Sequence, residues 1–291
     1  MDLQQLFEEI LPGNRLPTQQ VASVTCDSRQ VRRGSVFVCI AGSLTDGHNY
    51  VVQALQRGAI LVVAQRDCGV PNQLLFPDTR IVYARLCAAF FGYPARKLKL
   101  LGVTGTNGKT TTAWLTHHAL IQLGVKAGLI GTICNRVGEQ SIPARYTTPD
   151  AWELQELLAQ MLQCGCTHVV MEASSHALVQ HRTAGLTFEA GVFTNLTQDH
   201  LDYHHTMEAY RAAKGLLFAQ CRRAVINLDD EAGRWYLERL ACPALTYSEN
   251  QTRADLCARN LRLFPSHVEF EAHPGPSGPG LFTHPRRLLH L

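Results

Sequence analysis

The stretch that decides the fold is Leu100-Leu101-Gly102-Val103-Thr104-Gly105-Thr106-Asn107-Gly108-Lys109-Thr110-Thr111. A short apolar run leads into a glycine-containing turn, and an apolar-periodic stretch continues to Leu123. A strand, a glycine-rich turn and a helix in this order present backbone N–H groups to phosphate oxygens. Lys109 can then reach the β- and γ-phosphates of a nucleotide, and the Thr110 hydroxyl can bind Mg²⁺. We therefore expect residues 105–111 to form a nucleotide-binding loop.

This turn departs from the usual phosphate-loop pattern at one position. The pattern has a glycine five residues before Gly108, and Val103 stands there. The turn is thus a Gly-x-x-Gly-Lys-Thr variant. A tight turn beside an incidental lysine is the alternative interpretation.

Short apolar runs alternate with helical stretches along most of the chain. The predicted strands after the turn are 127–130, 167–172, 190–194, 223–227 and 266–272, and the predicted helices are 152–163 and 207–219. Apolar strands that alternate with helices predict an α/β fold, with a mostly parallel sheet and helices on both faces. Ligands of such sheets bind where the strands end.

The chain divides into three expected regions. Residues 1–98 form a small α/β domain with strands at 35–40 and 59–64 and a helix at 50–57, and residues 93–97 form a linker. Residues 99–272 form the central domain. Proline and glycine crowd residues 273–291, so we expect a disordered or loosely attached tail.

Composition excludes several classes of protein. Hydrophobic residues make up 46% of the 291 residues and charged residues 18%, as in a folded soluble protein. The net charge of +3 argues against a nucleic-acid or membrane-surface binder. No apolar run could span a bilayer, and the acidic N-terminus does not resemble a signal peptide, so a cytoplasmic location is the default expectation. The ten cysteines contain no Cys-x-x-Cys pair and predict reduced thiols rather than a zinc site.

Two further clusters of polar residues follow predicted strands. Glu172 ends an apolar strand, where a buried carboxylate needs a partner or a metal, although it could instead cap the next helix. Residues 194–205 contain three histidines and two aspartates within seven positions. We favour His200 as a single metal ligand there over a self-contained metal site. Lys214 is an ordinary surface lysine by composition.

Taken together, these segments resemble the Mur ligases, the ATP-dependent amide-forming family of peptidoglycan synthesis. The likeness covers roughly residues 26–272. The segments that carry it are Asp27-Ser28-Arg29, Asp46-Gly47, Gly105–Thr111, Tyr146-Thr147-Thr148-Pro149-Asp150, Ser174–Arg182 and Asp199-His200-Leu201-Asp202-Tyr203-His204. A folylpolyglutamate synthetase is the other member considered, and the Asp-Ser-Arg segment argues against it.

The resemblance implies a role for each matching residue. ATP and Mg²⁺ would be bound by Gly105, Thr106, Asn107, Gly108, Lys109, Thr110, Thr111, Asn227 and Asp230. Lys109, Glu172, His200 and Lys214 would be catalytic, with Thr110, Glu172, His200 and a CO₂-derived carbamate on Lys214 at the metal. The substrate UDP-N-acetylmuramoyl-L-alanyl-D-glutamate would contact Cys26, Ser28, Ser43, Leu44, Thr45, Thr147, Thr148, Ser174, Gln180 and Arg182.

The implied reaction forms an amide through an acyl phosphate. A substrate carboxylate attacks the γ-phosphate of ATP, and the amine of an amino acid, meso-diaminopimelate or L-lysine, displaces phosphate. No nucleic acid or membrane takes part, and the protein is expected to be a monomer.

The family also carries a C-terminal domain that binds the amino acid, and no such domain follows residue 272 here. We expect the 273–291 tail to be foreign to the fold, as after a frameshift or truncation, and amide formation by this chain to be weak or absent. A non-catalytic nucleotide- or UDP-sugar-binding remnant is the second hypothesis.

Overall fold

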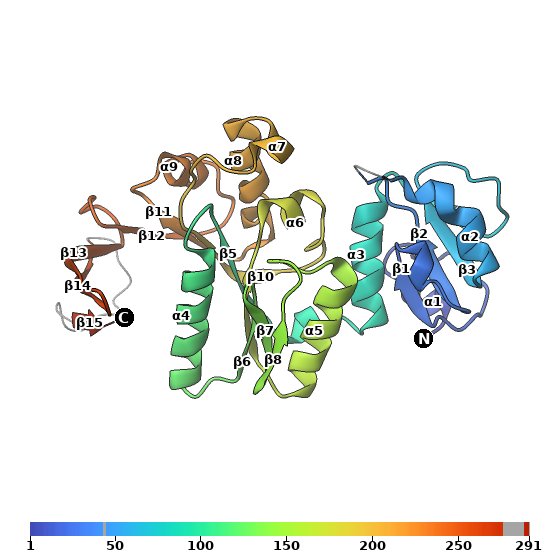
Figure 1. The fold of residues 1–291 in the computed structure, drawn as a ribbon, viewed down its shortest axis with the longest axis horizontal. Coiled ribbons are helices and arrows are strands. Elements are labelled where there is room, and N and C mark those ends of the chain that lie inside the picture. Colours follow the sequence, from blue (N-terminus) through green and yellow to red (C-terminus); the bar gives the residue numbers. More distant parts are fainter. Residues whose placement is uncertain (43–44, 276–287, 291) are drawn as a thin grey trace.

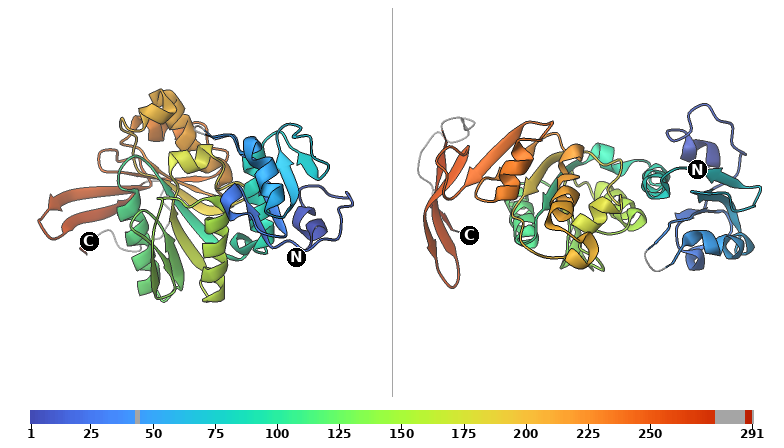
Figure 2. Two further views of the ribbon diagram at one scale, coloured as in Figure 1. Left: turned by 45° about the vertical axis from the view of Figure 1, so that its right-hand side comes forward. Right: turned by 90° about the horizontal axis from the view of Figure 1, so that it is seen from above.

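The computed structural model describes residues 1–42, 45–275 and 288–290, and its strands form two separate sheets. The first sheet is N-terminal and the second is central (Figure 1). Between β4 of the first sheet and β5 of the second lie a long helix and a short 3-10 turn at Pro94–Lys97. Figure 2 shows the N-terminal sheet set to one side of the larger central body.

The N-terminal sheet has four parallel strands in the order β1-β2-β3-β4. Alternate residues of β2 and β3 face opposite sides, because side chains alternate along a strand. Val36 and Val63 pack toward α3, whereas Phe37 and Val62 pack toward α2. The elements are α1 (Leu3–Phe7), β1 (Ser23–Thr25), β2 (Ser35–Val38), α2 (Val51–Gln56), β3 (Ala59–Ala64), β4 (Gln73–Leu75) and α3 (Thr79–Phe90).

The central sheet has the order β15-β14-β13-β12-β11-β10-β5-β9-β6-β7-β8 among the described residues. Strands β13 to β6 of this order run parallel, and antiparallel strands flank them on both sides. The strands are β5 (Lys99–Thr104), β6 (Ala127–Ile130), β7 (Cys134–Val137), β8 (Gln140–Pro143), β9 (His168–Glu172), β10 (Phe188–Phe193), β11 (Ala224–Asn227), β12 (Ala244–Ser248), β13 (Leu256–Leu263), β14 (Val268–Pro274) and β15 (Leu288–His290).

Helices cover both faces of this sheet, as the apolar strands predict. Val169 and Met171 of β9 pack with α5, and Val170 between them packs on the opposite face with α4. A further cluster joins β10 and β11 to α9. The helices are α4 (Lys109–Gln122), α5 (Ala151–Gln163), α6 (Ser175–Val179), α7 (Leu201–His204), α8 (Met207–Gly215) and α9 (Glu231–Leu237). The predicted α/β class with a mostly parallel sheet is confirmed.

An aromatic contact joins the two parts of the chain. The Trp152 ring of α5 lies 4.9 Å from the Phe90 ring and 4.8 Å from the Phe91 ring at the end of α3, between ring centroids. The apolar cluster of the N-terminal sheet therefore continues onto α5.

The prediction of an irregular tail from His273 onward is wrong at both ends of that tail. β14 continues through His273 and Pro274, and Leu288–His290 pairs with it as β15. Pro274 is the last residue of β14, and the backbone N–H of Gly275 after it donates to the Asp255 carbonyl at 2.9 Å. Residues 276–287 and 291 lie outside the described part of the chain.

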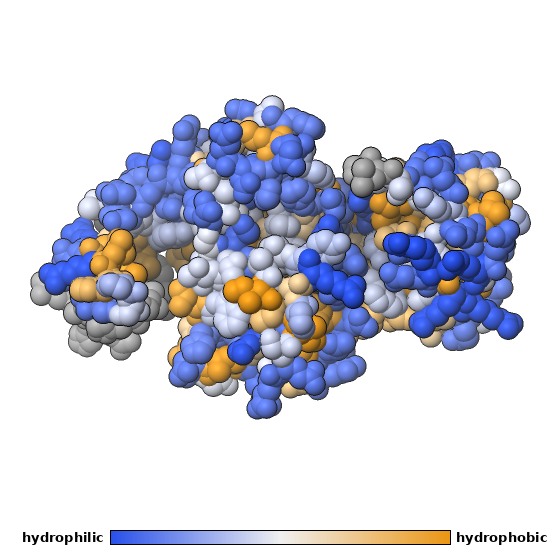
Figure 3. Space-filling model, viewed as in Figure 1, coloured by the Kyte–Doolittle hydropathy of each residue, from blue (hydrophilic) through white to orange (hydrophobic). Residues whose placement is uncertain are grey.

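The surface seen in Figure 3 is largely hydrophilic, with small scattered apolar spots. Within the described residues, no helix is both long and apolar enough to cross a membrane.

Candidate functional site

The predicted nucleotide loop connects β5 to α4 and requires glycine at Gly105. Gly105 has φ +147°, and a Cβ there would lie 1.8 Å from Thr194 Oγ1. Gly108, at φ +81°, is the N-cap of α4. The first N–H groups of α4 have no acceptor within the helix, so they are available to an anion.

Residues that follow β10 hold this loop in place. Asn107 N donates to Asn195 Oδ1 at 2.9 Å, and Thr106 N donates to the Asn195 carbonyl at 2.8 Å. The Thr194 hydroxyl donates to the Asn107 carbonyl at 2.7 Å. Neither Thr194 nor Asn195 was assigned a role from the sequence. The signal that could have found them is their position at the end of the predicted strand 190–194, which was expected to share the sheet with β5.

Lys109 turns back over the loop. Its Nζ donates to the carbonyl oxygens of Gly105 and Thr106, at 2.9 and 2.8 Å. Burial lowers the pKa of Lys109, and the charges of Glu172 and Asp199 oppose that shift. The ammonium thus lies at the mouth of the loop, where an incoming phosphate could replace the two carbonyl oxygens.

Glu172 lies at the end of β9, fully buried, and meets the loop through Thr110. Thr110 Oγ1 donates to Glu172 Oε2 at 3.0 Å. The Thr132 backbone N–H donates to the other carboxylate oxygen at 2.8 Å. A Cβ at Gly131 would lie 2.4 Å from that same oxygen, so a side chain there would force the carboxylate to move. The structure therefore brings together Thr110 and Glu172, two of the predicted metal ligands.

Lys214 is not a surface residue. Its side chain is buried on α8, and its Nζ lies 2.7 Å from the Gly105 carbonyl oxygen and 4.2 Å from the centre of the Tyr210 ring. Burial, followed by the nearby charge of Lys109, lowers the pKa of Lys214 to about 7. A substantial fraction of this amine is consequently neutral near pH 7.

His200 lies at the rim of the same site. It has φ +52°, and its side chain is about half exposed. Its ring centroid lies 4.9 Å from that of His176 and 6.1 Å from that of Tyr210. The buried His204 beside them bonds Ser175 Oγ through Nε2 at 2.9 Å, and burial lowers the pKa of His204 to about 4. His204 and Tyr210 are neighbours of the site that the sequence analysis did not single out.

The residues present fit a magnesium nucleotide only in part. Thr110 and Glu172 offer adjacent oxygen atoms, the ligands that Mg²⁺ prefers. Lys214 as an ammonium would repel the cation, whereas a carbamate on Lys214 would supply oxygen ligands. No group of three or more His, Cys, Asp or Glu side chains that could hold a metal occurs in the described residues.

A polar patch beside this edge contains the residues expected to hold the muramoyl dipeptide. Arg182 Nη1 donates to the Thr148 carbonyl at 2.8 Å, and Arg182 Nη2 donates to Gln180 Oε1 at 2.8 Å. Both Gln180 and Arg182 line a cavity of about 330 Å³ that also reaches Cys26 of the N-terminal part. This cavity therefore lies between the two sheets.

Thr147, Thr148 and Ser174 are three further residues that were predicted to contact the substrate. Thr148 is 1% exposed, and its hydroxyl contacts the Glu172 carbonyl at 2.8 Å and Ser174 Oγ at 3.2 Å. Its contacts support the backbone next to the site. Thr147 Oγ1 accepts from the Thr132 hydroxyl at 3.1 Å, and that hydroxyl also lies 3.1 Å from Glu172 Oε2.

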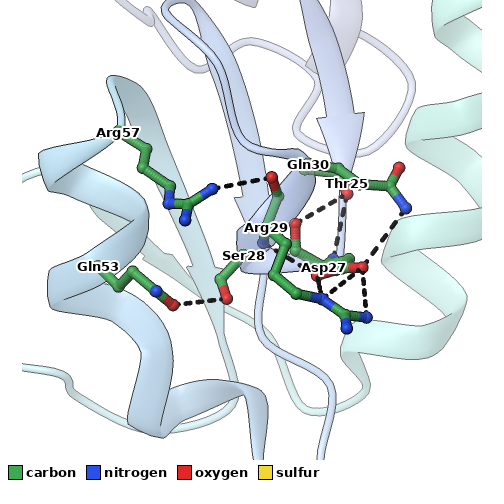
Figure 4. Close-up of polar contacts among 7 residues, drawn as sticks. All are labelled: Thr25, Asp27, Ser28, Arg29, Gln30, Gln53 and Arg57. Carbon is green, nitrogen blue, oxygen red and sulfur yellow. Dashed lines mark hydrogen bonds and ion pairs between the residues drawn. The ribbon is translucent and has the colours of Figure 1, made fainter.

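The Asp-Ser-Arg segment lines a second cavity in the N-terminal part. Ser28 Oγ donates to Gln53 Oε1 of α2 at 2.8 Å, and Arg29 and Asp27 form an ion pair beside it (Figure 4). Cys26, Ser28 and Thr45 line this cavity of about 520 Å³. Ser43 and Leu44 lie outside the described residues.

Asn227 and Asp230, predicted at the nucleotide, anchor the loop after β10. Asn227 Nδ2 donates to the Thr194 carbonyl at 2.8 Å. The Asp230 carboxylate accepts from the backbone N–H groups of Leu196 and Ala232, at 2.7 and 2.8 Å. Asn227 thus supports the nucleotide loop through Thr194, and Asp230 holds the segment that follows Thr194.

Two models of known protein families match this chain. The model of the Mur ligase middle domain matches residues 103–281, and the model described as Mur ligase family, catalytic domain, matches residues 20–85. The chain belongs to the Mur ligase family. The middle-domain match extends past His273, where the sequence analysis ended the family-like sequence.

Three individual Mur ligases are similar to this chain over more than half of their own length. A UDP-N-acetylmuramoyl-L-alanyl-D-glutamate–2,6-diaminopimelate ligase of Geobacillus thermodenitrificans is 43% identical over 284 residues, covering 93% of this chain and 58% of the relative. The ligase of that name from Listeria monocytogenes serotype 4b is 40% identical over 275 residues, covering 90% and 56%. A solved structure of such a ligase matches with a TM-score of 0.82 and 31% identity, covering 96% of this chain and 58% of that one. The chain thus spans somewhat more than half the length of these relatives.

Proposed function

We propose that the chain belongs to an ATP-dependent ligase that adds meso-diaminopimelate to UDP-N-acetylmuramoyl-L-alanyl-D-glutamate in the cytoplasm. The observation that carries the proposal is the convergence of Lys109, Thr110, Glu172 and Lys214 on one loop at the carboxyl edge of the sheet. The relatives named above support the choice of substrate.

The proposed reaction brings two anionic groups together, so the nucleotide loop must supply positive charge. The substrate carboxylate and the γ-phosphate are both anions, so their approach requires positive charge at the reacting atoms. Lys109 supplies one such charge, and the first N–H groups of α4 bind the phosphate oxygens. A magnesium ion, which Thr110 and Glu172 would hold, supplies further positive charge when bound.

We propose that Lys214 carries a carbamate in the active protein. Its neutral amine attacks CO₂, a C–N bond forms, and the amine proton leaves to solvent. The lowered pKa supports this step because only the unprotonated amine is nucleophilic. The product is an anion, so a repelling cation at the Gly105 carbonyl becomes a group that can ligate the metal.

Gln180 and Arg182 are proposed to orient the dipeptide, with the uridine part near Ser28. The cavity lined by Cys26, Gln180 and Arg182 supports this path, because it lies between the Asp-Ser-Arg segment and the central sheet. The carboxylate to be activated would then approach the loop from the side of Thr147.

The test combines binding with turnover. Calorimetry would measure binding of ATP with Mg²⁺ and of the UDP-muramoyl dipeptide, and an ADP-release assay would use diaminopimelate or L-lysine as the amine. Diaminopimelate-dependent ADP release that Lys109→Ala abolishes would support the proposal. Binding of both ligands without turnover would favour a non-catalytic binding protein, and binding of neither would refute both.

A further inference from the structure

The largest of the cavities described here lies far from the nucleotide loop. It has a volume of about 610 Å³ and is lined by Ala95–Leu100, Gly185, Thr187, Glu189 and Arg222. β5, β10 and β11 are parallel, so Lys99, Phe188 and Ala224 begin their strands at one edge. The nucleotide loop begins beyond the other end of β5, about 20 Å from Lys99 at roughly 3.3 Å per residue.

The lining of this cavity has an excess of positive charge. Arg96 is neutralised by two hydrogen bonds to Glu9, and Arg222 Nε lies 3.6 Å from Glu189 Oε2. Lys97 and Lys99 are exposed and form no ion pair with any residue in the described part of the chain. Lys97 and Lys99, which have no ion-pair partner among the described residues, thus line the same cavity as Arg222, whose ion pair with Glu189 is long.

Clustered cations in a concave surface concentrate anions, because the field lines converge there. Ammonium and guanidinium groups are the usual donors to phosphate oxygens, and Thr187 adds an exposed hydroxyl. The cavity falls in the volume range of small-molecule sites, so it can take a diphosphate together with an attached group.

From this arrangement we infer a second anion site, which binds a diphosphate-bearing ligand between Lys97, Lys99 and Arg222. It is separate from the proposed nucleotide site, since no residue lines both. Lys97 lies on the 3-10 turn that leads from α3 into β5, whereas Arg222 belongs to the central part. A ligand held by both would restrain that connecting turn.

The test uses the whole chain and sodium diphosphate, with Lys97→Gln/Lys99→Gln as the site variant and Lys126→Gln as the matched control. Lys126 is also an exposed lysine of the central domain and does not line the cavity. Calorimetry at fixed ionic strength should show diphosphate binding that survives Lys109→Ala. Removing both lysines should weaken it about tenfold or more, the loss expected for one or more charge-assisted hydrogen bonds. Hydrogen exchange at residues 94–99 should slow on binding.

A second arm identifies the source of the phosphate. Vesicles of phosphatidylcholine that carry a long-chain prenyl diphosphate are sedimented with the wild type and with the double variant. Vesicle binding that needs Lys97 and Lys99 assigns the site to lipid headgroups, and diphosphate binding alone assigns it to a soluble ligand. The inference is overturned if Lys109→Ala removes all diphosphate binding, or if Lys126→Gln weakens it as much as the double variant. These outcomes do not depend on ligase activity.

Discussion

The Nζ atom of Lys214 lies 2.7 Å from the carbonyl oxygen of Gly105, so a lysine of α8 contacts the nucleotide loop. Lys109 donates to the same carbonyl from α4. Two basic groups therefore share one acceptor, and burial makes the second of them easier to deprotonate. Their closeness has measurable consequences even without substrate.

The first prediction concerns stability against pH. The folded pKa of Lys214 is about 7, below its ordinary value of 10.5, so between these values the unfolded chain binds more protons than the native one. The free energy of unfolding should therefore rise with pH, by about 2 kcal/mol between pH 7 and pH 9. Urea unfolding measures it, and Lys214→Met should remove most of the rise. An equal rise in Lys214→Met would contradict the assignment.

Carbamate formation on Lys214 has a direct signature. With ¹³C-labelled bicarbonate near pH 8, the wild-type protein should show a carbamate carbon resonance, because neutral amine and dissolved CO₂ coexist there. The signal should be absent from Lys214→Met and present in Lys126→Gln. A signal of equal size in Lys214→Met would place the modification elsewhere.

A pair of glycine substitutions tests the shape of the loop. Gly105→Ala should destabilise the fold by about 3 kcal/mol or more, because its Cβ would collide with Thr194 Oγ1 in addition to straining the backbone. Gly124→Ala, at φ +76° with open space around its Cβ, should cost only about 1 kcal/mol. Both values come from urea unfolding. Equal costs would show that the contact with Thr194 is unimportant.

Glu172→Gln separates metal binding from folding. The amide keeps an acceptor for the Thr132 N–H but loses the negative charge. The enhancement of ATP binding by Mg²⁺, measured by calorimetry, should fall about tenfold or more. Glu139→Gln, at an exposed position, should leave it unchanged. Full Mg²⁺ enhancement in Glu172→Gln would exclude Glu172 as a metal residue.

Arg182→Gln should weaken binding of the UDP-muramoyl dipeptide about tenfold to a hundredfold, since a guanidinium donor to a carboxylate is lost. Its hydrogen bond to the Thr148 carbonyl also disappears. Arg239→Gln, an exposed arginine on the segment after α9, provides the control. Unchanged affinity for the dipeptide would remove Arg182 from the substrate site.

The α/β class, and the edge of the sheet at which the candidate site lies, could be predicted because both follow from local sequence patterns. Apolar strands and the Gly105–Thr111 turn are short-range features, and each strand end marks the same sheet edge. The antiparallel strands β7 and β8 were missed, since they are short and carry polar residues such as Asn135 and Gln140. The exposure of Lys214 could not be predicted either, because its burial depends on the loop 109 residues earlier in the chain.

The bond between Asn107 and Asn195 spans 88 residues of sequence. During synthesis, α4 and the turn before it leave the ribosome well before β10 exists. The phosphate-binding turn therefore acquires its final shape only when the chain is complete to about residue 197, as expected for parallel sheets with distant strand partners. Until then its glycines are free to sample other conformations, so nucleotide binding reports late assembly of the whole central sheet.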